Sequence, residues 1–198
     1  MATVTIRKGT SPVWTMRWMQ AVYGYVTGAT LNASAPCTIT APTHGLPNGW
    51  LVAIQNATGG FSSLAASNPP KPTEFRRVRV IDGDTLELND LNAVGFKASG
   101  PVTLAYRLPV DLLDCTARAQ MRAKVNSAEP VLAFSSALGG GITLVPAEAK
   151  TLLAFTEAQT AGLKAGMYVM DMELVTPHGE VLATNVFEVE VTEEVTRD

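Results

Sequence analysis

Two histidines, two cysteines and several carboxylates are the residues best suited to chemistry in this sequence, and their spacing decides what they can do. A zinc centre needs three or four histidine, cysteine or carboxylate ligands, and a nucleophilic mechanism needs a base that is oriented by a third group. His44 lies at a predicted strand-to-turn corner and His178 at the tip of a predicted hairpin. Neither has ligands or a nucleophile at a suitable spacing, so we interpret both as turn residues.

The two cysteines, Cys37 and Cys115, each lie beside a threonine in a strand-like run, and neither belongs to a CxxC pair. An isolated cysteine of this kind behaves mainly as a small apolar side chain. We therefore interpret both as reduced thiols that are buried or half-buried. The sequence leaves open whether they form a disulfide with each other.

Carboxylates and glycines offer three further candidate sites. Asp82–Asp84 holds two carboxylates, but a calcium loop supplies several more oxygen ligands, and Asp-Gly suits a tight hairpin turn. Gly139–Gly141 lacks the Lys-Ser/Thr pair and the following helix of a phosphate loop. Acid–base catalysis needs a desolvated carboxylate, whereas the glutamates near the C-terminus alternate outward along a predicted strand: Glu188, Glu190, Glu193 and Glu194. We therefore predict no catalytic residue, no metal and no cofactor, and we expect that the protein is not an enzyme.

Composition narrows the class of protein further. The 198 residues are 46% hydrophobic and 17% charged, with a net charge of −3. Nucleic-acid binding rests on clustered Lys and Arg, and the densest basic run, Arg76 to Arg79, is more simply the solvent face of a strand. No segment has the apolar length of a membrane span or of a signal peptide. We expect a protein that is made in the cytoplasm, is not inserted in a membrane and does not bind nucleic acid.

Alternation of apolar and polar residues dominates the chain, and this is the pattern of half-buried strands. It is clearest over residues 116–122, where Ala117, Ala119 and Met121 alternate with polar residues. Residues 13–18 and 168–174 show the same period. One segment, 156–163, favours a helix of one or two turns, with a threonine cap and a glycine near its end. The predicted fold class is therefore all-β.

The middle of the chain differs from its two ends in amino-acid composition and in the length of its predicted strands. It is rich in Pro, Gly, Asn and Ser, and its predicted strands are short: 37–40, 50–55, 75–81 and 85–88. This change predicts a small β-barrel, residues 28–105, inserted between the early strands of a β-sandwich. The sandwich would be discontinuous and consist of residues 1–27 and 106–198.

Protein contacts are expected at a long loop of the predicted barrel. Between Gln55 and Thr73 the sequence predicts an exposed loop with polyproline character, and a long loop in a compact domain is often functional. The candidate contact residues are Phe61, Pro69, Pro70 and Pro72. Aromatic side chains near the start of the chain are expected in the core or in packing between the domains: Trp14, Trp18, Tyr23 and Tyr25.

Strand motifs of the predicted sandwich resemble a phage family. Lys8–Trp18, Pro109–Arg122, Gly140–Leu144 and Ala165–Gly179 are similar, in this order, to motifs of the immunoglobulin-like N-terminal domain of phage upper-baseplate proteins. The chain departs from that pattern at Leu113–Cys115, where the family usually has Thr-Gly-Tyr. This departure changes a turn and removes an aromatic side chain.

The inserted segment carries a resemblance of its own. Ile39–Trp50 followed by Val78–Leu88 resembles a β-barrel of phage structural proteins. That barrel is similar to the first catalytic-cysteine half-domain of ubiquitin-activating enzymes, which has no catalytic residue of its own. The two resemblances together cover most of the chain and imply an immunoglobulin-like sandwich with an inserted barrel.

The same resemblances imply a function. They imply a structural protein of a bacteriophage virion, made in the host cytoplasm and placed in the tail or baseplate region. Its expected partners are other virion structural proteins, including receptor-binding proteins that it anchors, and further copies of itself in a symmetric oligomer. Two alternatives stay open. One is a head-associated protein of the neck, head–tail connector or capsid decoration, and the other is a carbohydrate-binding module.

Overall fold

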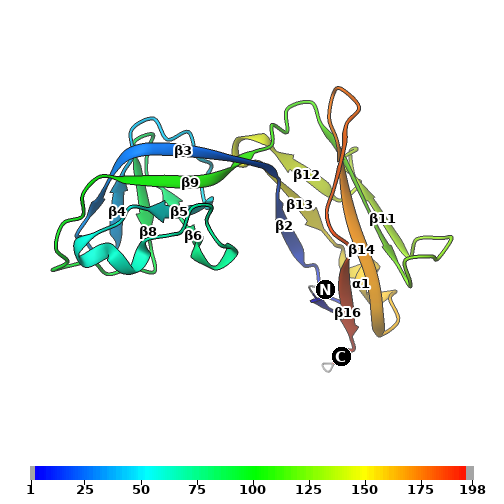
Figure 1. Ribbon diagram of the computed structural model, residues 1–198. Coiled ribbons are helices and arrows are strands. Elements are labelled where there is room, and N and C mark those ends of the chain that lie inside the picture. Colours follow the sequence, from blue (N-terminus) through cyan, green and yellow to red (C-terminus); the bar gives the residue numbers. More distant parts are fainter. Residues whose placement is uncertain (1–2, 195–198) are drawn as a thin grey trace. The chain divides into compact units, whose positions relative to one another are not determined.

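The computed structural model of the protein describes residues 3–194, and β-strands dominate this part of the chain (Figure 1). Residues 3–194 form sixteen strands, one α-helix and three short 3-10 helices: α1 (Glu157–Ala161), η1 (Gly59–Leu64), η2 (Pro72–Glu74) and η3 (Pro146–Glu148). The predicted all-β fold class is confirmed. Among the helices of this range, none is long and apolar enough to cross a lipid bilayer.

The chain divides into two compact units, Met1–Trp18 with Asp111–Asp198, and Met19–Val110. The domain boundaries predicted from the sequence fall instead after residues 27 and 105. The difference arises because residues 19–32 form one continuous strand, β3 (Met19–Asn32), which pairs with β9 (Val102–Pro109) from Met19 onward. Residues 195–198 of the predicted sandwich lie outside the described part of the chain.

The discontinuous unit is a sandwich of two sheets. The larger sheet has the strand order β1 (Thr3–Arg7), β16 (Phe187–Thr192), β14 (Gly166–Val175), β10 (Thr116–Arg122) and β11 (Leu132–Ser135), and β15 (Val181–Ala183) pairs with β14. The smaller sheet has the order β12 (Ile142–Val145), β13 (Lys150–Ala154) and β2 (Val13–Arg17).

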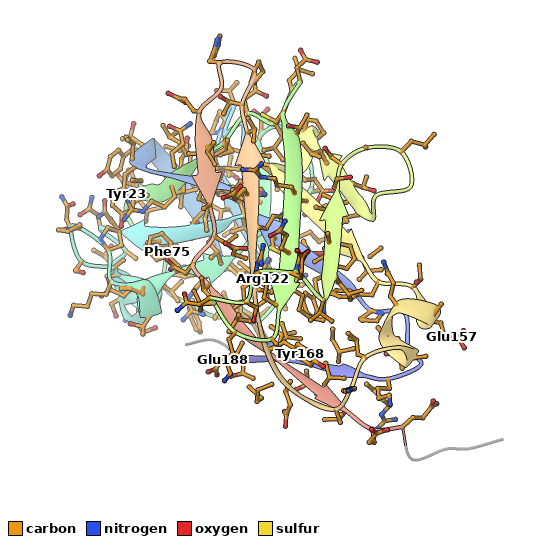
Figure 2. The ribbon with its side chains drawn as sticks, turned by 90° about the vertical axis from the view of Figure 1, so that its right-hand side faces the viewer. Tyr23, Phe75, Arg122, Glu157, Tyr168 and Glu188 are labelled. Atoms are coloured by element: carbon orange, nitrogen blue, oxygen red, sulfur yellow. The ribbon has the colours of Figure 1, made fainter. Side chains whose placement is uncertain are left out.

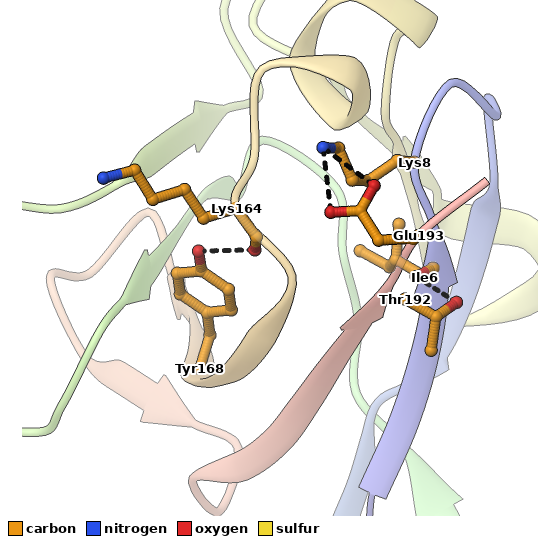
Figure 3. Close-up of polar contacts among 6 residues, drawn as sticks. All are labelled: Ile6, Lys8, Lys164, Tyr168, Thr192 and Glu193. Atoms are coloured by element: carbon orange, nitrogen blue, oxygen red, sulfur yellow. Dashed lines mark hydrogen bonds and ion pairs between the residues drawn. The ribbon is translucent and has the colours of Figure 1, made fainter.

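The pairing of β1 is the one parallel pairing among the named strands of the sandwich, and side chains reinforce it. Thr3 to Arg7 pair in register with Glu188 to Thr192. Lys8 Nζ lies 3.2 Å from a carboxylate oxygen of Glu193, and Thr192 Oγ1 donates to the carbonyl of Ile6 at 3.4 Å (Figure 3). The N-terminal strand is thus fixed beside the last strand of the sandwich.

The sandwich core follows from the alternation in the sequence. Ala117, Ala119 and Met121 of β10 are buried, and so are three side chains of β14 at the same period: Met170, Met172 and Leu174. The two sheets meet through aromatic rings, since Phe155 packs edge-on against Phe134 at 4.9 Å. Each fully buried large apolar side chain contributes about 1.5–3 kcal/mol of transfer free energy.

Helix α1 and the turn that follows it set the start of β14. The Thr156 hydroxyl accepts from the Gln159 N–H at 3.2 Å, and the Gln159 side chain accepts from the Thr156 N–H at 2.8 Å, which is a capping box. Tyr168, labelled in Figure 2, donates its hydroxyl hydrogen to the carbonyl of Lys164 at 2.8 Å (Figure 3). This bond ties the start of β14 to the turn that follows α1.

The inserted unit is a sheet that nearly closes on itself. Its strand order is β6 (Arg76–Arg77), β5 (Leu51–Gln55), β9, β3, β4 (Cys37–Thr40), β8 (Thr85–Leu88) and β7 (Arg79–Val80). The strands at the two ends of this series, β6 and β7, are separated in sequence by Val78 alone, so the predicted strand 75–81 bridges both edges. Val78 is fully buried and donates its N–H to the carbonyl of Trp50 at 2.9 Å.

Candidate functional site

His44 is a buried structural residue of the barrel. Its side chain is only 5% exposed, Nδ1 accepts from the Leu46 N–H at 3.0 Å, and Nε2 lies 2.9 Å from the carbonyl oxygen of Asp82. A carbonyl can only accept and a backbone N–H can only donate, so these contacts fit a ring that donates from Nε2 and accepts at Nδ1. Both nitrogens are therefore engaged within the barrel, and neither is available to a metal. His178 is exposed in the turn between β14 and β15.

The Asp82–Asp84 turn uses its carboxylates to hold backbone. Asp82 accepts from the N–H of Asp84 at 2.9 Å, and Asp84 accepts from the N–H of Thr43 at 2.7 Å. The pKa of Asp82 is lowered, first by the bond from the Asp84 N–H and then by the Thr85 hydroxyl. Across residues 3–194, no three His, Cys, Asp or Glu side chains are grouped so that they could hold a metal ion.

Both cysteines carry free thiols. Burial raises the pKa of Cys37. The pKa of Cys115 is also raised, by burial first and then by the negative charges of Asp111 and Asp114. A raised pKa lowers the fraction of thiolate, which is the nucleophilic form. The raised pKa values therefore favour neither thiol as a nucleophile.

The predicted contact loop is an ordered, packed segment. Phe61 lies in η1, is 0% exposed and packs edge-on against Phe96 at 5.2 Å. Pro70 is buried as well. The expectation that these two side chains are exposed is wrong, because the loop folds its own apolar groups inward. Pro69 and Pro72 are exposed, and their role as contact residues stays a prediction.

One carboxylate organises the proline-rich part of this loop. Glu74 Oε2 accepts from the N–H of Lys71 at 2.7 Å, from the Ser67 hydroxyl at 2.8 Å and from the Ser67 N–H at 3.1 Å. These bonds lower the pKa of Glu74, that from Lys71 most. These bonds tie Ser67 and Lys71, which flank Pro69, to one carboxylate.

The basic run of the barrel is matched by acceptors. Arg76 lies 3.1 Å from Asp90, Arg79 lies 3.1 Å from Glu87, and Arg77 donates to the carbonyl of Gly49 at 3.0 Å. Arg77 and Arg79 are exposed, as the interpretation of a solvent-facing strand predicts. Surface ion pairs of this kind contribute little to stability.

The early aromatic residues divide between core and surface. Trp18 is buried and donates from Nε1 to Thr151 Oγ1 at 3.2 Å, so its predicted core position is confirmed. In the other unit, Tyr23 stacks on Phe75 with an interplanar angle of 8°, and the Arg107 guanidinium carbon lies 3.9 Å from the centre of the Tyr23 ring. Tyr25 is 50% exposed.

A polar groove of about 370 Å³ lies on the sandwich over β10 and β14. Arg118 pairs here with Glu173, and Arg122 donates to the carbonyl of Ala128 at 2.8 Å and to Gln120 Oε1 at 2.6 Å. Asp171 also lines the groove. The groove thus holds two positive and two negative side chains, and its formal charges sum to zero.

A second groove of the sandwich is larger and apolar. It has a volume of about 650 Å³ and lies between β1, β2 and the start of β16. None of the side chains that line it is ionisable. Trp14 forms part of its wall and packs edge-on against Phe155 at 4.7 Å. Sequence reasoning missed this groove, because alternation predicts the strand at residues 13–18 but does not reveal which of its edges stays open.

Comparisons of the chain with protein-family models, with curated proteins and with solved structures found no match. What the chain does must therefore be argued from the geometry of its two units and from the motifs in its sequence.

Proposed function

We propose that the protein is a structural component of a bacteriophage virion, in the tail or baseplate region, where it joins neighbouring virion proteins or anchors receptor-binding proteins. The observation that carries the proposal is a nested architecture. A β-sandwich is interrupted between β2 and β10 by a nearly closed barrel. The motifs that resemble phage upper-baseplate proteins and phage barrels occur along the chain in this same order.

The positions of the polar motif residues support a role in assembly. The residues that a reactive centre would use are engaged in holding turns: His44 and Asp84 in the barrel, and Glu74 beneath the proline segment. Such groups stiffen the loops that they hold, and a stiff surface loses less conformational entropy when a partner binds. We infer that the protein works through the shapes it presents to neighbours.

The test is to locate the protein in particles. Phage particles purified from the lysate are labelled with antibodies against this protein and imaged by electron microscopy. Label at the tail tip supports the proposal, and label at the neck or capsid supports the head-associated alternative. A protein that stays in the lysate and is missing from purified particles would contradict both.

A second candidate, carbohydrate binding, is favoured by one observation. Tyr25 is half-exposed on β3, next to Tyr23, and the two ring centres are 6.4 Å apart. Exposed aromatic rings can stack on the apolar faces of sugars. Glycan-array binding that is lost in Tyr25→Ala, and kept in the matched variant Tyr168→Phe of the other unit, would favour this function.

A further inference from the structure

Within residues 3–194, strand β2 pairs with another strand along only one of its two edges. It is the last strand in the order β12-β13-β2, and Figure 1 shows it beside β13 at the border of that sheet. Phe155 donates its N–H to the carbonyl of Pro12 at 3.0 Å, and Trp18 donates to the carbonyl of Ala149 at 2.8 Å. Even-numbered residues of β2 therefore bond to β13.

Residues on an antiparallel strand alternate between bonding to one neighbour and to the other. Val13 and Thr15 consequently direct their N–H and C=O groups away from β13, toward the open edge. Both residues are exposed, and Val13 is 59% exposed although it is apolar. An unpaired edge of this kind is a template for a further strand.

The apolar groove lies along this same edge. Its walls include Val4 of β1, Val13, Trp14 and Met16 of β2, and Val186 and Phe187 next to and within β16. Its remaining lining residues are uncharged and polar. A charged side chain placed there would lose its hydration without gaining a partner. The groove thus selects for uncharged, apolar side chains.

We propose that the β2 edge and its groove are a docking site for an extended segment of another protein chain. The segment adds a fourth strand beside β2 and places uncharged apolar side chains, at alternate positions, in the groove. Backbone hydrogen bonds supply affinity in such strand addition, and the groove supplies selectivity for the alternating side chains. The inference does not depend on the virion assignment, because it rests on edge geometry alone.

The probe is a capped peptide, acetyl-Lys-Thr-Val-Thr-Val-Thr-Val-Lys-amide, titrated into the full chain and followed by NMR. We expect saturable shifts of the Val13 and Thr15 amide signals. Two further peptides carry N-methyl groups on all valines or on all threonines. In a strand, these two sets of amides face opposite edges. We therefore expect one N-methylated peptide to bind about tenfold more weakly or not at all, and the other to bind nearly as well as the parent.

Variants of the protein test the same edge. Thr15→Pro removes an N–H that points to the open edge and leaves the pairing with β13 intact, so it should abolish binding. Leu144→Pro is the matched control, since the register of β12 with β13 directs its N–H toward the opposite border of the sheet. The N-methylated peptides test the unmodified protein and need neither variant to fold.

Three results would overturn the proposal. One is the absence of Val13 and Thr15 shifts at millimolar peptide. Another is equal weakening by both N-methylated peptides, which would show that the backbone of an added strand does not face β2. The third is concentration-dependent self-association of the protein that Thr15→Pro removes, which would identify a second copy as the occupant.

Discussion

The two units of this protein differ in their sheet edges: the barrel sheet nearly closes, whereas a sheet of the sandwich ends in an open strand. In the barrel, β6 and β7 lie at the two ends of the sheet and are joined through buried Val78, so the two ends of the sheet come together there. In the sandwich, β2 ends its sheet with outward-facing backbone groups at Val13 and Thr15. An open sheet edge can pair with a further strand, and closing the sheet into a barrel removes its open edges. We infer that the barrel is stable without an added strand, whereas the sandwich can accept one at the edge of β2.

The largest loss of stability is expected from removing a large side chain of the barrel core. Trp50 is fully buried, and its Nε1 donates to the carbonyl of Arg107 at 2.8 Å. Trp50→Ala should lower the free energy of unfolding of the barrel by about 3–5 kcal/mol, because it leaves a large cavity and removes the bond to the Arg107 carbonyl. Chemical denaturation followed by NMR signals from both units measures this loss.

The matched control for that experiment is in the sandwich. Trp14 is only half-buried, so Trp14→Ala should cost less than Trp50→Ala and should act on the sandwich signals. Equal losses in both units from Trp50→Ala would contradict the view that the barrel is self-sufficient, since they would mean that the two units unfold as one.

A smaller effect is expected from His44, which ties the barrel's turns together. His44→Ala removes the acceptor for the Leu46 N–H and the donor to the Asp82 carbonyl, and the loss should be about 1–3 kcal/mol in the free energy of unfolding. His178→Ala is the control and should stay within about 0.5 kcal/mol of the unmodified protein, because His178 is exposed. Thermal unfolding of both variants, read by circular dichroism, makes the comparison. Indistinguishable midpoints would show that the His44 bonds do not stabilise the barrel.

In the sandwich, the hydroxyl of Tyr168 holds a turn as His44 does in the barrel. Tyr168→Phe deletes the hydroxyl that donates to the carbonyl of Lys164 and keeps the ring. We expect a loss of about 0.5–1.5 kcal/mol in the stability of the sandwich. Tyr25→Phe, at a half-exposed position of the barrel, is the matched deletion of a hydroxyl and should be nearly neutral. Equal effects from the two deletions would argue against a corner fixed by Tyr168.

The strands of both units could be predicted from sequence to the extent that one face of each is buried. Residues 116–122 alternate cleanly because β10 has the core on one side and water on the other, and the buried residues are those that the alternation marks. Val78 interrupts the predicted strand 75–81, because the chain there passes from one edge of the barrel to the other. The local pattern of apolar and polar residues predicts which face of a strand is buried. It does not predict where the chain passes from one edge of a sheet to the other.

Long-range pairing explains what the sequence could not predict. The open edge of β2 depends on β13, more than 130 positions away in the chain by their pairing of Trp14 with Leu153. Phe61 was expected on the surface because Gly, Ser and Pro around it are typical of exposed loops. Its burial depends on Phe96, which no local pattern links to it.

The smallest expected effect concerns pH and the exposed proline segment of the barrel. The pKa of Glu74 is lowered from the usual 4.5, mainly by the bond from the Lys71 N–H and next by the Ser67 hydroxyl. A carboxyl whose pKa is lower in the folded state stabilises the fold above its unfolded pKa, and this contribution is lost as the pH falls through the folded value. The unmodified protein should therefore lose barrel stability below about pH 4.5 more steeply than Glu74→Gln does.

This prediction tests whether the two units respond separately to pH, because Glu74 belongs to the barrel alone. The measurement is the unfolding midpoint of each unit between pH 7 and pH 3, for the unmodified protein and for Glu74→Gln. The difference between the two proteins should be confined to barrel signals and should shrink at the acid end, where Glu74 is protonated and resembles glutamine in charge. Ser67→Ala, which removes one of the bonds to Glu74, should reproduce part of the effect. A difference that grows as the pH falls would mean that the bonds to Glu74 favour its protonated form, opposite to the hydrogen-bonding geometry in which three donors point at one carboxylate oxygen.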